Sequence, residues 1–229
     1  MVADPLMLTG FSLFRNLSEK ELARFASRLH VKTFAPGTNI MTAEQPGEVV
    51  YFILSGSVKI HIEQSGGADV TLAILGRGDT VGEMSLIDSA GRSASVLTLE
   101  ETTVLWMDSA AFQLALREIP EFAFNLVLTL VSRVRLCNEL IQALASLNVY
   151  GRIARQLLAF AERADETGSD GQIRLPIRLT QKDIADLVGA SRKRVNQVMV
   201  SFKNQGLISV DADGWITVHH REGLAKYCQ

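Results

Sequence analysis

Residues 179–202 read LTQKDIADLVGASRKRVNQVMVSF, and this stretch decides the fold of the C-terminal part of the chain. Thr180, followed three residues later by Asp183, is a helix N-cap of the capping-box type. Gly189 interrupts this helix, and Ser191 is placed to cap a second one. The predicted inward faces consist of Ile184, Leu187 and Val188, then Val195, Val198 and Phe202. Two helices joined by so tight a turn predict a helix-turn-helix.

A short strand-turn-strand pattern follows these helices. Residues 207–219 read LISVDADGWITVH, with Asp213-Gly214 as a hairpin turn, so the module is predicted to be a winged helix-turn-helix. A hairpin of helices that only packs does not explain the basic and amide residues that open the second helix. Arg can fork onto guanine, and Asn or Gln can pair with adenine in the major groove. The predicted base-reading residues are Arg192, Lys193, Arg194, Asn196 and Gln197. Ser191 also belongs to the predicted DNA-binding set, and Thr180, Gln181 and Lys182 are predicted to lie over phosphates.

Charge is distributed unevenly along the chain. The 229 residues carry a net charge of −2 and a pI of about 6.1, which gives no sign of a nucleic-acid partner. The basic residues Arg178, Lys182, Arg192, Lys193, Arg194 and Lys203 are nevertheless opposed in their segment by only Asp183 and Asp186. One positive patch on a mildly acidic protein fits double-stranded DNA as a partner.

The pattern is different in the N-terminal part. Ser18 and Glu21 have capping-box spacing and predict a short amphipathic helix within residues 9–30. From residue 32 to residue 107, turn signals recur at short intervals between β-rich runs such as VVYFIL, SVKIHI, VTLAIL and ASVLTL. This arrangement is typical of a compact all-β barrel or roll.

A long helix is predicted between these two parts, because Pro120 is the only glycine or proline between Asp108 and Gly151. Its apolar residues step by three and four along the seam Val127, Leu130, Val134, Cys137, Ile141 and Leu144. A helix packed on its own barrel is one interpretation of this seam. A two-stranded coiled coil in a homodimer is the other, and the narrow seam favours it. A hinge is expected at residues 147–151, LNVYG.

Residues 81–96, VGEMSLIDSAGRSASV, place Glu83, Arg92 and small hydroxyl residues among glycines in an otherwise apolar region. A buried strand pair favours Val and Ile throughout, so this mixture suggests an anionic ligand that also carries hydroxyl groups. A buried monoanion needs a charge partner and several donors, and Arg offers a planar fork of donors. A structural ion pair between Arg92 and Glu83, with no ligand, is the alternative.

Other classes of protein are not expected. Cys137 and Cys228 are far apart and lack CxxC spacing, and the four histidines are scattered, so neither disulfides nor a metal site is predicted. The sequence contains no Ser-His-Asp or Cys-His set, no paired catalytic carboxylates and no Walker loop, so an enzyme is not predicted. No apolar run suits a membrane span and no secretory leader opens the chain, so a cytoplasmic protein without a membrane partner is expected.

In this order, a β-roll, a long helix and a winged helix-turn-helix resemble one family, the cyclic-AMP receptor protein type (Crp/Fnr) of bacterial transcription regulator. The resemblance is carried by YFILSGSVKI, VGEMSL with GRSAS, LNVYGRIA and LTQKDIADLVGASRKRVNQ. It implies an α+β fold, with a cyclic-nucleotide-binding β-roll (double-stranded β-helix) over residues 1–116, a dimerisation helix over 117–147 and the winged helix-turn-helix over 148–229. It implies a sequence-specific DNA-binding regulator under allosteric control of a cyclic nucleotide, with cyclic AMP as the expected effector and no prosthetic group.

The resemblance also implies roles for particular residues. In this family a Gly-Glu segment caps the cyclic phosphate, its Glu accepts from the ribose 2′-hydroxyl, and an Arg-Ser pair binds the phosphate. The matching positions are Gly82, Glu83, Met84, Ser85, Arg92, Ser93 and Ala94. The family's Thr-Ser or Thr-Asn pair, which faces the adenine across both subunits, is Cys137-Asn138 here. Because a thiol is a weak donor, cyclic GMP and cyclic di-GMP stay open as effectors.

Further expectations concern the partners. The family's Arg-Glu…Arg reading set becomes Arg192, Lys193 and Gln197, so Arg192 is expected to read a guanine, while the operator is expected to differ where Lys replaces Glu. RNA polymerase is expected at the acidic loop 165–171. The effector is expected to straighten the long helix and set the two recognition helices one DNA turn apart. A ligand-independent DNA binder controlled by its abundance is the alternative.

Overall fold

A computed structural model describes residues 4–63, 69–88, 90–164 and 171–229. The chain divides into two compact units, here called the N-terminal unit (residues 1–134) and the C-terminal unit (residues 135–229). The predicted division at residues 116/117 and 147/148 stays a prediction, and the acidic loop 165–171 lies, apart from Gly171, outside the described residues.

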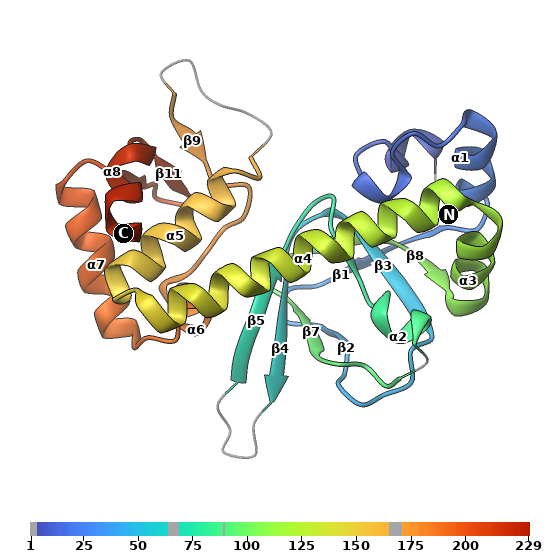
Figure 1. The fold of residues 1–229 in the computed structure, drawn as a ribbon, viewed down its shortest axis with the longest axis horizontal. Helices are drawn as coiled ribbons and strands as arrows, with labels where there is room; N and C mark the ends of the chain where they lie inside the picture. Colours follow the sequence, from blue (N-terminus) through green and yellow to red (C-terminus); the bar gives the residue numbers. More distant parts are fainter. Residues whose placement is uncertain (1–3, 64–68, 89, 165–170) are drawn as a thin grey trace. The chain divides into compact units, whose positions relative to one another are not determined.

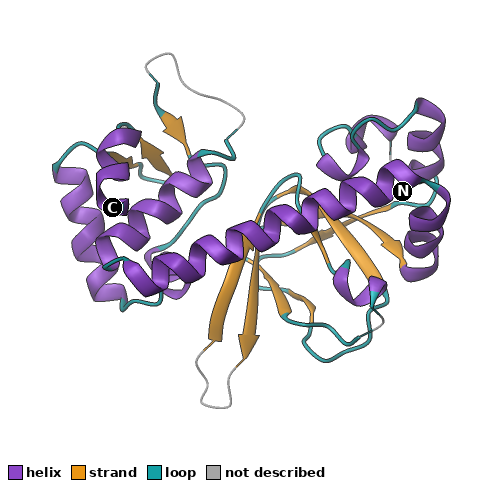
Figure 2. Cartoon of the chain, viewed as in Figure 1, coloured by secondary structure: helices purple, strands orange, loops and turns teal. Residues whose placement is uncertain are grey.

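The N-terminal unit contains a β-roll of two four-stranded antiparallel sheets, as the turn spacing predicts (Figure 2). The strand orders are β1-β8-β3-β6 and β2-β7-β4-β5. The strands are β1 (His30–Phe34), β2 (Asn39–Met41), β3 (Val49–Ser55), β4 (Val58–Glu63), β5 (Asp69–Leu75), β6 (Thr80–Val81), β7 (Ser95–Thr98) and β8 (Thr102–Asp108). The helices are η1 (Pro5–Leu8), η2 (Ser12–Phe14), α1 (Glu19–Ala26), α2 (Met84–Ile87), α3 (Ser109–Glu118) and α4 (Pro120–Ser146), whose second half belongs to the C-terminal unit.

The strands β3 and β8 serve two apolar cores, because successive side chains on a strand point to opposite faces of its sheet. Val50, Phe52, Leu105 and Met107 pack in one core with residues of α1, α3 and α4. Tyr51, Ile53 and Val104 pack in the other with Val58 and Val96 of the second sheet. These strands are therefore apolar along most of their length, which explains the run VVYFIL.

The long helix α4 begins at Pro120, whose fixed φ and missing N–H suit the first turn of a helix. Phe122 and Leu126 are buried in the core of the N-terminal unit. The predicted seam is different: Val127, Val134 and Ile141 are 53%, 60% and 64% exposed in the single chain. Leu130 of the seam packs against the core of the N-terminal unit. Packing on its own β-roll therefore explains the start of α4 and Leu130, but not the three exposed seam residues.

The C-terminal unit is the predicted winged helix-turn-helix (Figure 1). Its elements after α4 are α5 (Val149–Ala161), β9 (Ile173–Arg174), α6 (Gln181–Val188), α7 (Arg192–Asn204), β10 (Ile208–Val210), β11 (Ile216–Val218), α8 (Arg221–Ala225) and η3 (Lys226–Cys228). The Thr180–Asp183 capping box opens α6, Gly189 ends it in the left-handed conformation with a φ of 61°, and Ser191 caps α7. The hairpin β10–β11 pairs with β9, and Gly214 in its turn also has a positive φ.

The predicted break between α4 and α5 lies where LNVYG indicates it. Asn148 caps α5 by accepting a hydrogen bond from the Gly151 N–H at 3.1 Å. Gly151 lies so close to η3 that a Cβ there would be 2.4 Å from the Tyr227 carbonyl oxygen. Cys228 packs beside it, with burial raising the pKa of its thiol. None of the described helices combines the length and the apolar character that crossing a lipid bilayer requires.

Candidate ligand pocket and nucleic-acid interface

The candidate pocket contains a glycine, Gly82, at a position that does not accept a side chain. Gly82 follows β6 with a φ of 92°, a region that L side chains rarely adopt. A Cβ at this position would lie 2.6 Å from Arg92 Nη1 and 2.3 Å from the Met41 Cε. Gly82 therefore lets the guanidinium of Arg92 approach the backbone directly.

Arg92 is the buried cation of this stretch and is 8% exposed. Its Nη1 donates to the Gly82 carbonyl at 2.7 Å and to Ser85 Oγ at 2.9 Å, and its Nη2 donates to the Val49 carbonyl at 2.7 Å. A guanidinium has five N–H groups, so two remain without a partner among the described residues. Burial lowers the pKa of Arg92, while Tyr51 and Glu83 oppose that shift.

The ligand-free alternative requires an ion pair between Glu83 and Arg92, and the two side chains do not form one. Its carboxylate is 1% exposed and forms an ion pair with Arg133 of α4, which also donates to the Thr80 carbonyl. The second oxygen, Oε2, has no hydrogen-bond partner in the described part of the chain. A buried carboxylate oxygen without a donor is costly, so this site suits a ligand that donates a hydrogen bond.

Arg133 is a site residue that the sequence reasoning missed. It precedes Cys137 by four residues, so both lie on one side of α4. An arginine beside the apolar seam, one turn from the expected base-contacting pair, is the signal that points to it. Through Arg133, α4 holds the acid of the pocket.

The other predicted pocket residues differ from one another in burial. Ser85 is buried against Arg92 and also lines a cavity of about 340 Å³, while Ala94 is buried. Ser93 is exposed, and the side chain of Met84 is half-exposed. Cys137 and Asn138 are exposed on α4 in the C-terminal unit, so their contact with a base stays a prediction.

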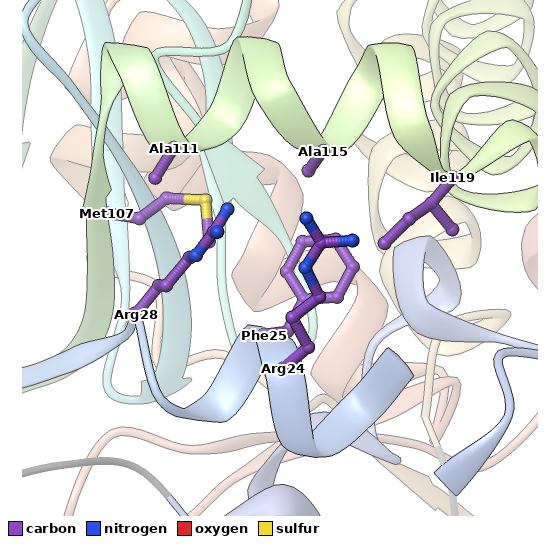
Figure 3. Close-up of a pocket in the computed structure, with 7 residues that line it drawn as sticks. All are labelled: Arg24, Phe25, Arg28, Met107, Ala111, Ala115 and Ile119. Carbon is purple, nitrogen blue, oxygen red and sulfur yellow. The ribbon is translucent and has the colours of Figure 1, made fainter. Parts of the chain in front are cut away.

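A second cavity lies between α1 and α3 (Figure 3). Its lining consists of Arg24, Phe25, Arg28, Met107, Ala111, Ala115 and Ile119. The volume is about 10 Å³, which is the space of one water molecule. This cavity cannot hold a nucleotide.

The candidate nucleic-acid interface is the exposed side of α6 and α7. The predicted residues Thr180, Gln181, Lys182, Ser191, Arg192, Lys193, Arg194, Asn196 and Gln197 are all exposed. Val195, Val198 and Phe202 face inward and are fully buried. The hydroxyls of Thr180 and Ser191 already cap α6 and α7. Among the basic residues of this set, Arg194 donates to Gln197, whereas Lys182, Arg192 and Lys193 have no partner among the described side chains.

Residues 31–118 match the cyclic nucleotide-binding domain family, and residues 151–227 match the Crp-like helix-turn-helix domain family. A CRP-like cAMP-activated global transcriptional regulator from Mycobacterium tuberculosis is 32% identical over 220 residues, covering 96% of this chain and 97% of that protein. The chain belongs to the CRP-like family of transcriptional regulators. The cAMP-activated regulator Vfr of Pseudomonas aeruginosa is also 32% identical and aligns over 83% of this chain and 90% of Vfr.

Among solved structures, FixK2 from Bradyrhizobium japonicum has a TM-score of 0.78 at 19% identity, covering 88% of this chain and 98% of that chain. At this identity the likeness shows the fold alone. Membership of the CRP-like family confirms the predicted family and its arrangement of β-roll, long helix and winged helix-turn-helix. It also places the chain among transcription regulators and not among enzymes.

Proposed function

We propose that this CRP-like regulator binds operator DNA as a homodimer under the control of cyclic AMP bound at Glu83 and Arg92. The observation that carries the proposal is that two buried side chains of opposite charge, Arg92 and Glu83, each keep hydrogen-bonding capacity that no described residue uses. Arg92 keeps two N–H groups for an anion, and Glu83 keeps one oxygen for a donor. A cyclic phosphate next to a ribose hydroxyl supplies that anion and that donor.

Cyclic AMP is favoured over other cyclic nucleotides by the relatives that are 32% identical and named as cAMP-activated. Cyclic GMP shares the phosphate and the ribose, so the cluster at Arg92 does not separate the two nucleotides. The separation falls to Asn138, whose amide can donate to or accept from a base edge, and to the weak donor Cys137. No prosthetic group is needed in this scheme.

The ligand signal would enter α4 through Arg133. A ribose hydroxyl that donates to Glu83 competes with Arg133 for the charge of the same carboxylate, so ligand binding changes how firmly α4 is held. Coupling requires the ligand to bind the two states of α4 with different affinities. A change in α4 then alters the placement of the winged helix-turn-helix that begins after Asn148.

The homodimer is supported by the exposed seam of α4. Val134 and Ile141 are more than half exposed in the single chain, and Leu144 is 45% exposed. Apolar residues exposed at a spacing of three and four suit a second copy of the same helix. Two copies would present two α7 helices to half-sites about one DNA turn apart.

The same proposal includes one further partner, RNA polymerase, and a cellular location. The acidic loop 165–171 is proposed to contact RNA polymerase; replacing it with Gly and Ser should then abolish transcription activation in vitro while DNA binding stays. Unchanged activation would exclude the loop as the contact. A regulator of chromosomal DNA would act in the cytoplasm.

The test of ligand control uses purified protein stripped of nucleotide. Calorimetry with cyclic AMP, cyclic GMP and cyclic di-GMP should give the tightest binding for cyclic AMP. Fluorescence anisotropy on duplexes enriched by the wild-type protein from a random library should then show tighter DNA binding with cyclic AMP. Equal DNA affinity with and without nucleotide would favour the ligand-independent alternative.

The test of the dimer is native mass spectrometry, which should give twice the 25.1 kDa chain mass and identify any nucleotide that co-purifies. Ile141→Asp places a charge on the seam and should give monomers. Gln142→Asp is the matched control, because Gln142 is exposed next to the seam and should leave the dimer intact. A dimer that tolerates Ile141→Asp would exclude the seam as its interface.

A further inference from the structure

The start of α5 carries an aromatic side chain that reaches the recognition helix. The Tyr150 ring stacks on Tyr227 of η3, with the ring centroids 5.8 Å apart, and meets Phe202 of α7 edge to face at 5.8 Å. Phe202 and Tyr227 are themselves 5.1 Å apart, so the three rings form one cluster. The first turn of α5 is thereby fixed to the buried side of α7.

Tyr150 also contacts the exposed side of α7 through Arg194. The guanidinium carbon of Arg194 lies 5.6 Å from the centroid of the Tyr150 ring, within the range of a cation–π interaction. Arg194 Nη1 in turn donates to Gln197 Oε1 at 3.2 Å. A continuous set of contacts therefore runs from Tyr150 through Arg194 to Gln197.

Arg194 differs in its contacts from the two basic residues that precede it. Arg192 and Lys193 have no hydrogen bond or ion pair within the described chain, so their side chains can turn toward DNA freely. Arg194 is held on a ring at one end and on an amide at the other. The three adjacent basic residues of α7 are thus unequal in freedom.

The contact with Arg194 sets the direction of the Gln197 amide. A glutamine reads adenine through its amide oxygen and its NH₂ group together, and these must point in the right order. Because Arg194 donates to the oxygen, the oxygen faces Arg194 and the NH₂ group is left free to donate. The oxygen keeps a second lone pair for the base.

We propose that Tyr150 is a positioning residue for DNA recognition: its ring holds Arg194, and Arg194 holds the Gln197 amide in the orientation that reads an adenine. The inference rests on the proposed function, since it requires α7 to bind DNA. It assigns to the α4–α5 junction a direct part in base preference. Tyr150 itself need not touch the DNA.

The experiment measures base preference and not only affinity. Wild-type protein with cyclic AMP enriches duplexes from a random library, and anisotropy then compares the enriched duplex with every single-base substitution of one half-site. Tyr150→Phe keeps the ring and should leave the preference unchanged. Tyr150→Leu removes the ring and should lower discrimination at one base pair by roughly threefold to tenfold, the range of a cation–π contact.

Tyr227→Leu is the matched control, because it removes a ring from the same cluster but no contact with Arg194. It should lower the thermal midpoint about as much as Tyr150→Leu while the base preference stays. Arg194→Met should lower discrimination at the same base pair, and Tyr150→Leu added to it should cause no further loss. Thermal melts of all variants report folding separately.

Two results would overturn the inference. One is an unchanged preference in Tyr150→Leu, and the other is an equal loss of preference in Tyr227→Leu, which would make the effect a matter of general packing. If wild-type protein enriches no sequence at all, the proposed function fails and the inference falls with it. If the protein binds DNA selectively and only the tyrosine has no effect, the inference alone fails.

Discussion

The arginine of the pocket and the arginines of the recognition helix are placed in opposite ways. Arg92 is buried and already donates to three protein acceptors, whereas Arg192 is exposed and has no partner among the described residues. A buried guanidinium with fixed partners selects a ligand by fit. An exposed guanidinium contributes binding free energy at any phosphate, and this contribution falls as the salt concentration rises. It becomes selective for sequence only when it contacts a base edge.

Arg92→Ala tests the role of the buried arginine in ligand binding, and we expect the largest effect from this substitution. Cyclic AMP affinity measured by calorimetry should fall by at least about 100-fold, because a buried charged partner is removed. The Gly82 and Val49 carbonyls also lose their donor, so the free energy of unfolding should fall by roughly 1–3 kcal/mol in urea titrations. Unchanged affinity in a folded variant would exclude Arg92 from the pocket.

The corresponding change on the exposed side is Arg192→Ala. Operator affinity should fall by roughly tenfold to 100-fold with preference lost at one guanine, while the thermal midpoint stays within about a degree, since Arg192 holds no protein partner. Anisotropy on single-base variants of the operator measures both effects. A uniform loss over all sequences would instead assign Arg192 to a phosphate.

Glu83 is tested by a change in the ligand. Wild-type protein should bind cyclic AMP roughly tenfold more tightly than 2′-deoxy cyclic AMP, because the deoxy ligand leaves Glu83 Oε2 without a donor. In Glu83→Ala the two ligands should bind equally, as measured by calorimetry. Arg133→Met is the matched control: it leaves the carboxylate in place and should keep the preference for the hydroxyl.

The smallest expected effect concerns Lys182, which is exposed at the start of α6. Lys182→Gln should weaken binding to all duplexes alike and reduce the slope of log affinity against log salt by about one. Anisotropy at several salt concentrations measures this slope. An unchanged slope with altered base preference would move Lys182 from the phosphates to a base.

Local rules predicted the segments whose geometry depends on near neighbours. Ser18 with Glu21 and Thr180 with Asp183 form the predicted capping boxes, since a cap needs only residues three apart. The ion pair of Glu83 with Arg133 joins residues 50 positions apart, and no spacing rule reaches so far. The contact of Tyr150 with Arg194 was missed for the same reason. Sequence therefore predicted the helix-turn-helix and its caps correctly, while the contacts between distant residues came from the fold.

The two cysteines offer a practical use of the unequal burial described above. Cys137 is exposed on α4, whereas Cys228 is half-buried and burial raises the pKa of its thiol, so it holds less reactive thiolate near neutral pH. A thiol-specific spin label should therefore attach to Cys137 first, without any engineered substitution. In the proposed dimer the two labels would lie opposite each other along α4. The distance between the two labels, measured by electron paramagnetic resonance, would report the movement of that helix in the native sequence.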